Sequence, residues 1–236
     1  MIASRRGYAP EREGTQPPYD WPAYASTIKR APKRPLIPLA STLSELTGPT
    51  FEERWCGPDT PDLTRIAGGE AQGQRIILAG RVLDEDGRPV RRTLLEVWQA
   101  NAAGRYAHDT DDHDAPLDPH FLGAGQVVTD DDGAFRFLTI RPGAYPWRNT
   151  YNAWRAAHIH FSVFGPSFAT RLITQMYFPG DPLLETDPIF HSIADADARA
   201  RLISAYDPDL SEAEYALGYR WDIVLRGRGE TPMERP

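Results

Sequence analysis

The sequence predicts an all-β protein, a two-sheet antiparallel β-sandwich with a long irregular N-terminal segment and one short helix. From residue 75 onward, short runs rich in β-branched and aromatic residues alternate with turn sequences, which is the pattern of antiparallel strands. The first 70 residues are instead rich in proline and lack sustained periodicity. With 236 residues, 41% of them hydrophobic, the chain is long enough for one sizeable core.

The N-terminal segment, residues 1–70, is expected to be irregular because prolines interrupt it repeatedly. Tyr19, Trp21 and Tyr24 supply apolar anchors, which a disordered tail would lack. We therefore expect this segment to pack on a partner chain. Residues 71–236 are expected to form one β-sandwich domain.

The strands of this domain are expected in chain order, separated by turn residues. Two acidic sequences that end in glycine, 84–87 and 130–133, are expected to be hairpin turns. The single helix is expected at 195–206. The expected strands are 75–83, 92–99, 134–140, 158–164, 171–178 and 219–225.

Charge and composition exclude several classes of function. The net charge of -7 gives no basic footprint for nucleic acid, and no apolar run approaches the roughly 20 residues of a membrane span. Arg5 and Arg6 are followed by proline and charged residues, so an export signal is not expected and the predicted location is cytoplasmic. Cys56 is the only cysteine, which rules out an internal disulfide.

His158 and His160 are the first candidates for metal ligands. If they lie in a strand, alternation places both imidazoles on one face and Ile159 on the other. Such a pair suits zinc, copper, nickel or iron equally. A His-x-His sequence alone is also compatible with two ordinary half-buried histidines.

Tyr106 and Tyr145 narrow the choice of metal. A phenol with an ordinary pKa of about 10 is a poor ligand for a divalent ion at neutral pH. A strongly Lewis-acidic trivalent ion can remove the phenolic proton and keep the phenolate bound. Together with His158 and His160 the two tyrosines therefore suggest one Fe(III) ion per chain.

The surrounding sequence resembles the signature of the intradiol ring-cleavage dioxygenases, non-haem ferric enzymes that open catechol rings between the two hydroxylated carbons. The stretches that carry the resemblance are YPWRN at 145–149 and NAWRAAHIHF at 152–161. Further similarity runs from about Tyr24 to Arg226 and includes GRY at 104–106, TQMYF at 174–178 and YRWDIVLRG at 219–227.

The resemblance implies a role for each motif residue. Tyr106, Tyr145, His158 and His160 would hold the iron, and Tyr145 would leave it to accept a substrate proton. Arg155 would stabilise charge that develops on the substrate ring.

The resemblance assigns roles to three further residues. Gln175 would hydrogen-bond to His160 or to Arg155, and Tyr24 and Trp147 would contact the substrate. The domain at 71–236 would then be the catalytic one.

Within the family, the chain is most similar to the beta subunits of members that work with a homologous alpha subunit in a symmetric assembly. The resemblance then implies cleavage of protocatechuate by O2 to 3-carboxy-cis,cis-muconate, a step of aromatic catabolism in the beta-ketoadipate pathway. An intradiol dioxygenase for catechol or hydroxyquinol is the alternative. A non-catalytic, prealbumin-like ligand-binding sandwich is the alternative from another class.

The other polar clusters of the sequence do not have the pattern of a metal site. The acidic stretches 109–114 and 130–133 lack the ligand spacing of an EF-hand loop, so solvated loops or turns are favoured over calcium sites. The remaining histidines do not share the alternation of His158 and His160. They are His108, His113, His120 and His191, and they are not expected to be ligands. Ala156 stands where family members often have proline.

Overall fold

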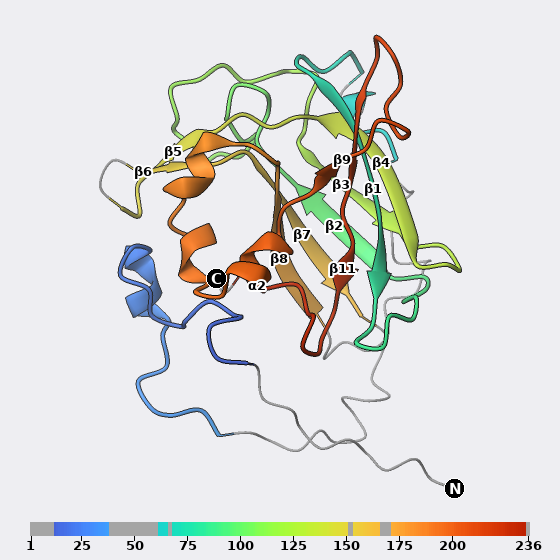
Figure 1. Cartoon of the computed structure of the whole chain (residues 1–236). Helices are drawn as coiled ribbons and strands as arrows, with labels where there is room; N and C mark the ends of the chain where they lie inside the picture. Colours follow the sequence, from blue (N-terminus) through green and yellow to red (C-terminus); the bar gives the residue numbers. More distant parts are fainter. Residues whose placement is uncertain (1–11, 38–60, 66–67, 151–152, 166–170, 235–236) are drawn as a thin grey trace, which may run out of the picture.

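The computed structural model describes residues 12–37, 61–65, 68–150, 153–165 and 171–234 (Figure 1). Within these ranges the chain forms two main β-sheets, with short helices gathered to one side of them. The first sheet contains β1 (Arg75–Leu83), β4 (Ala134–Ile140), β9 (Ala205–Tyr206), β10 (Leu217–Arg220) and β11 (Ile223–Val224). The second contains β2 (Leu94–Trp98), β3 (Ala124–Val128), β7 (His158–Phe164) and β8 (Arg171–Tyr177).

The second sheet is antiparallel throughout, in the order β3-β2-β7-β8. In the first sheet β1 pairs antiparallel with β4 but parallel with β10 and β11. The predicted all-β sandwich is therefore confirmed, and the two parallel pairings add a feature that periodicity alone does not reveal. A separate pair of short strands, β5 (Tyr145–Trp147) and β6 (Ala153–Arg155), lies antiparallel outside both sheets.

Tight turns form at 84–87 and 130–133. The prediction that each turn joins two strands of one hairpin is wrong. β1 and β2 flank the first turn but belong to different sheets, as do β3 and β4 around the second. After the first turn a short stretch pairs back on β1 around the bridge of Leu83 with Pro89: Asp84 N donates to Arg88 O at 2.9 Å, and Val90 N donates to Val82 O at 2.8 Å. Arg92 then takes a φ of 49°, and the chain enters the other sheet.

The main core lies between the two sheets. All seven residues of β7 are buried, and alternation divides them between two environments. Ile159, Phe161 and Val163 join the core, while His158 and His160 face the opposite side and approach each other. One strand thus anchors the fold and presents two imidazoles.

The helix expected at 195–206 is much shorter in the structure. α2 covers Ala196–Ala200, and Asp195 caps it by accepting a hydrogen bond from Ala198 N at 2.8 Å. The chain then leaves the helix because Ser204 N donates to Tyr177 O at 2.9 Å beside β8. The remaining helices within the described ranges are short 3-10 helices: η1 (Ala25–Lys29), η3 (Leu63–Arg65), η4 (Pro182–Glu185) and η5 (Phe190–Ser192).

The described part of the N-terminal segment lies against its own chain. Trp21 Nε1 donates to Pro188 O at 2.8 Å, and Ala25 N donates to Asn149 O at 3.1 Å. Packing of this segment on a partner chain stays a prediction. In the described ranges, no helix combines the length and apolar character that crossing a membrane requires.

Candidate metal centre

Four side chains converge at one end of the second sheet. His158 Nε2 and His160 Nε2 lie 3.2 Å apart. Tyr145 Oη lies 3.2 Å from the first imidazole nitrogen, and Tyr106 Oη lies 3.1 Å from the second. Two ligand atoms about 2.1 Å from one ion, at a right angle to each other, are about 3 Å apart. The four atoms are therefore spaced as ligands of a single ion would be.

These donors come from three separate segments. His158 and His160 lie two positions apart on the face of β7 that is turned away from the main core, and Tyr145 begins β5. Tyr106 follows β2 in a loop, where its backbone N donates to Asp111 Oδ2 at 2.7 Å. Asp111, from the acidic stretch 109–114, thus helps to order the loop of a candidate ligand.

Two glycines let the Tyr106 loop approach the Tyr145 strand. Gly104 has a φ of +80°, and a Cβ on it would lie 2.1 Å from Ala144 O. A Cβ on Gly143 would lie 2.5 Å from Ala102 O. Side chains at either position would push the two backbones apart. The two tyrosine rings consequently meet edge to face, with centroids 5.4 Å apart.

The outer nitrogens of both imidazoles are already engaged. His158 Nδ1 donates to Ala156 O at 2.6 Å, and His160 Nδ1 lies 3.1 Å from Glu234 Oε2. A histidine that donates from Nδ1 carries its free electron pair on Nε2. Both Nε2 atoms therefore face the tyrosines as candidate ligands.

The electrostatics of the cluster favour neutral protein groups. Burial raises the pKa of Tyr106 well above its usual value, with a further contribution from Tyr145. Burial also raises the pKa of Tyr145, and burial together with Arg155 lowers the pKa of His158 well below its usual value. Deprotonation of the phenols thus requires a strong Lewis acid, which is what a trivalent ion provides.

No set of three or more His, Cys, Asp and Glu side chains in the described ranges could hold a metal. The site therefore depends on its tyrosines. The two phenols and two imidazoles fit ferric iron, for which phenolate oxygen and imidazole nitrogen are suitable donors.

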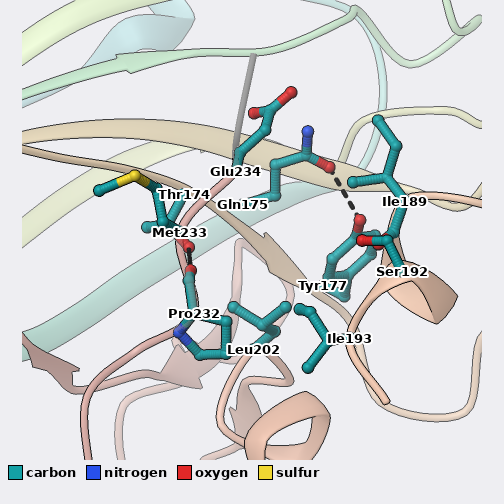
Figure 2. Close-up of a pocket in the computed structure, with 10 residues that line it drawn as sticks. All are labelled: Thr174, Gln175, Tyr177, Ile189, Ser192, Ile193, Leu202, Pro232, Met233 and Glu234. Atoms are coloured by element: carbon teal, nitrogen blue, oxygen red, sulfur yellow. Dashed lines mark hydrogen bonds between the residues drawn. The ribbon is translucent and has the colours of Figure 1, made fainter. Parts of the chain in front are cut away.

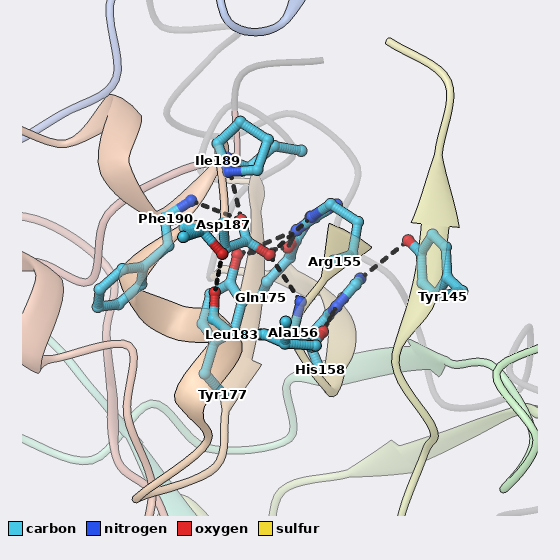
Figure 3. Close-up of polar contacts among 12 residues, drawn as sticks. Tyr145, Arg155, Ala156, His158, Gln175, Tyr177, Leu183, Asp187, Ile189 and Phe190 are labelled. Atoms are coloured by element: carbon cyan, nitrogen blue, oxygen red, sulfur yellow. Dashed lines mark hydrogen bonds and ion pairs between the residues drawn. The ribbon is translucent and has the colours of Figure 1, made fainter. Parts of the chain in front are cut away.

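Arg155 lies behind His158 in a buried polar network (Figure 3). Its side chain is only 2% exposed. Arg155 Nε donates to Asp187 Oδ2 at 2.9 Å, and Arg155 Nη2 donates to Gln175 Oε1 and, at 3.1 Å, to Tyr177 Oη. Of the two partners expected for Gln175, Arg155 is the correct one, because His160 is paired with Glu234 instead.

Asp187 organises this network from the loop after β8. It accepts hydrogen bonds at 3.0 Å from the backbone nitrogens of Ala156, Ile189 and Phe190, besides that from Arg155. Proline at position 156 could not donate such a bond. The alanine at this position therefore gives Asp187 one more donor than a proline would.

Tyr24 and Trp147 also meet near Arg155. Their ring centroids are 4.6 Å apart at an angle of 68°, and Arg155 Cζ lies 5.4 Å from the centroid of Trp147. The N-terminal segment thereby contributes an aromatic ring beside the β5–β6 pair. All sequence-predicted site residues thus lie in one region of the molecule.

Asp187 and Glu234 are the polar partners that sequence reasoning missed. Asp187 is separated from Arg155 by 32 positions, and Glu234 from His160 by 74. No local pattern connects them, since each meets its partner only through the fold. The other histidines lie elsewhere: His108 contacts Thr110, and His113 packs on Trp154.

The chain belongs to the dioxygenase family, whose sequence model matches residues 46–227, and its β-sandwich fold is that of the intradiol ring-cleavage dioxygenases. A second model, described as the N terminal of the protocatechuate 3,4-dioxygenase beta subunit, matches residues 8–42. The predicted family is thereby confirmed.

Individual relatives support this placement. The protocatechuate 3,4-dioxygenase beta chain of Burkholderia cepacia is 59% identical over 94% of both chains. The alpha chain of that enzyme, also from Burkholderia cepacia, is 30% identical over 82% of this chain and 96% of its own length. Catechol 1,2-dioxygenase from Acinetobacter sp. ADP1, solved with bound mercury, superposes with a TM-score of 0.53 at 25% identity, covering 74% of this chain and 60% of that one.

Proposed function

We propose that this chain binds one Fe(III) ion and cleaves protocatechuate with O2 to 3-carboxy-cis,cis-muconate, as the beta subunit of a two-chain enzyme. The observation that carries the proposal is the convergence of two phenol oxygens and two imidazole Nε2 atoms, each 3.1 to 3.2 Å from a neighbour. The 59% identity to a protocatechuate 3,4-dioxygenase beta chain supports the choice of substrate.

Tyr106, Tyr145, His158 and His160 would hold the metal. When bound, ferric iron supplies the Lewis acidity that lets a catechol bind as a dianion and react with O2. The resemblance of the YPWRN stretch at 145–149 to the family signature assigns Tyr145 as the exchangeable phenol, and it lies on the short β5 strand outside both sheets. It would accept a substrate hydroxyl proton as it leaves the metal.

Arg155 would stabilise negative charge that develops on the substrate ring. Burial disfavours its cation, but Asp187 together with Tyr177, Tyr145 and Glu234 outweighs this effect, and the pKa of Arg155 is raised well above its usual value. A permanent charge is therefore fixed close to His158. Gln175 would keep the guanidinium oriented, while Tyr24 and Trp147 would bound the substrate ring.

The homologous alpha subunit is the proposed partner, because relatives named alpha and beta chains both match this sequence. Residues 1–70 would pack on that subunit, and its residues would complete the pocket. The proposed assembly is a closed set of alpha-beta pairs, in the cytoplasm.

The test is an anaerobic visible absorption spectrum of the chain co-expressed with its alpha subunit, recorded before and after protocatechuate is added. We expect a tyrosinate-to-iron band that shifts on addition and decays when air is admitted, with one muconate formed per substrate. Catechol and hydroxyquinol serve as competing substrates. Protein that stays colourless after iron reconstitution would contradict the proposal and favour a non-catalytic ligand-binding sandwich.

A further inference from the structure

We infer that Glu234, the third residue from the C-terminal end of the sequence, is a positioning residue for the iron site, which holds the His160 imidazole with Nε2 directed at the metal. The inference rests on the proposed function, since it concerns a ligand of the proposed iron. It adds a residue that lies outside the signature motifs and 74 positions from the histidine it contacts.

The contact is specific to the ring nitrogen that does not face the tyrosines. Glu234 Oε2 lies 3.1 Å from His160 Nδ1, while His160 Nε2 lies 3.1 Å from Tyr106 Oη on the other side. The imidazole also stacks on Trp98, with ring centroids 4.8 Å apart and planes 5° from parallel. Stacking on Trp98 fixes the plane of the ring. The Glu234 carboxylate holds Nδ1 on the side away from the tyrosines.

The carboxylate is well buried. The side chains of His160 and Glu234 are 11% and 14% exposed, so water competes little for their hydrogen bond. Metal-binding histidines commonly donate their second nitrogen to a carboxylate, which fixes the tautomer and makes the imidazole a stronger donor. Glu234 supplies that arrangement here.

The segment that carries Glu234 is anchored on both sides. Glu234 N donates to Ile173 O at 2.7 Å, and Thr174 Oγ1 donates to Pro232 O at 2.7 Å. Met233 N donates to Gln16 Oε1 at 2.7 Å, which ties the segment to the N-terminal part of the chain. The position of the carboxylate is therefore set by β8 and by the N-terminal segment together.

Glu234 also faces the Arg155 network. It lines a small cavity of about 10 Å³ with Gln175 and Tyr177, and Figure 2 shows the Gln175 amide nitrogen directed toward the Glu234 carboxylate. Among the described residues, Gln175 Nε2 has no hydrogen-bond partner of good geometry. A small shift of either side chain would join the two networks through this contact.

The experiment compares Glu234→Gln and Glu234→Ala with Glu230→Gln in the full chain co-expressed with the alpha subunit. Glu230 is the matched control, because it lies in the same segment and its carboxylate accepts a hydrogen bond from Gln16 Nε2 at 2.8 Å. The readouts are the dissociation constant for Fe(III) in competition with a chelator, the tyrosinate-to-iron absorption band, and the melting temperature of the iron-free protein.

We expect Glu234→Ala to weaken iron binding 10- to 100-fold and Glu234→Gln to weaken it less, because its amide oxygen can still accept from Nδ1. Both variants should move the absorption band to longer wavelength, since a less basic imidazole leaves the iron more acidic. Glu230→Gln should keep wild-type affinity and band position. If the melting temperature falls equally in all three variants, the expected differences in iron affinity and in band position still hold.

Two other results would overturn the inference, and they are distinguishable. If the wild-type protein binds iron and both Glu234 variants match its affinity and band, Glu234 does not position the ligand, although the proposed function stands. If Glu230→Gln loses as much iron affinity as the Glu234 variants do, Glu234 only anchors the segment and does not position the ligand. If the wild-type protein binds no ferric iron, the proposed function fails and the inference fails with it.

Discussion

The guanidinium of Arg155 and the carboxylate of Asp187 form a buried ion pair, with Arg155 Nε 2.9 Å from Asp187 Oδ2 and side chains that are 2% and 0% exposed. A buried charge is costly unless it is paired and hydrogen-bonded. Both conditions are met here, since Asp187 also accepts three backbone donors. The pair keeps a fixed cation behind His158 and beside Trp147.

Removing one partner should therefore destabilise the fold. Asp187→Asn is expected to lower the free energy of unfolding by about 3–5 kcal/mol, because it leaves the Arg155 cation buried without its counter-charge. Urea denaturation checks this value. The control is Glu212→Gln, which breaks the ion pair of Glu212 with Arg136 at an exposed site and should cost less than about 1 kcal/mol. Equal costs would show that the buried pair contributes no more than a surface one.

Gly104→Ala should disturb the candidate metal centre through the backbone. The added Cβ would meet Ala144 O at 2.1 Å, so the Tyr106 loop must move away from Tyr145. We expect iron affinity to fall at least tenfold. Gly87→Ala is the matched control, because Gly87 has a similar φ of +76° but no atom within 4 Å of the added Cβ.

The two glycine variants share the cost of a left-handed backbone, about 1–2 kcal/mol. Only Gly104→Ala adds the collision with Ala144. Calorimetric melting of the iron-free proteins and chelator competition separate the two effects. If Gly87→Ala loses as much iron affinity as Gly104→Ala, the close approach of the two backbones is not what positions the tyrosines.

The sequence predicts best where local pattern and tertiary environment agree. The strands at 75–83, 134–140 and 158–164 form with the expected bounds, because each alternates or continues apolar residues that the core can bury. The resemblance in the motif stretches locates every candidate ligand. The bounds predicted for the helix at 195–206 are wrong, because the chain pairs beside β8 and the helix ends at Ala200.

Long-range contacts account for the other differences. The two turns were predicted as hairpins because turn residues specify a reversal of the chain but not the sheet that the next strand joins. Asp187 and Glu234 were missed for the same reason: their partners lie 32 and 74 positions away. Sequence separations of this size produce no periodic pattern, so these contacts can be seen only in the folded chain.

Tyr145→Phe should separate iron binding from proton transfer. Tyr106, His158 and His160 would remain to bind the metal, so iron content should fall only modestly. The turnover number is expected to drop 100-fold or more, because general-base groups typically contribute factors of 10²–10⁴. Steady-state oxygen uptake with iron content measured on the same sample checks this. Tyr206→Phe, at a ring that is 52% exposed, is the control. Unchanged turnover in Tyr145→Phe would remove its role as the proton acceptor.

Removing the metal should lower the thermal stability of the protein. The proposed ligands come from β7, from the start of β5 and from the loop after β2, so one ion connects three separate segments of the chain. A ligand that binds only the folded state at a thousand times its dissociation constant adds about 4 kcal/mol to the free energy of unfolding. Differential scanning calorimetry should therefore show a melting temperature several degrees lower after chelation, restored by Fe(III).

The His158→Ala, His160→Ala double variant should melt at one temperature with or without Fe(III). A wild-type melting temperature that is insensitive to chelation in a protein that has lost its visible band would mean that the segments are held together by their own hydrogen bonds, and that the ion contributes to chemistry alone.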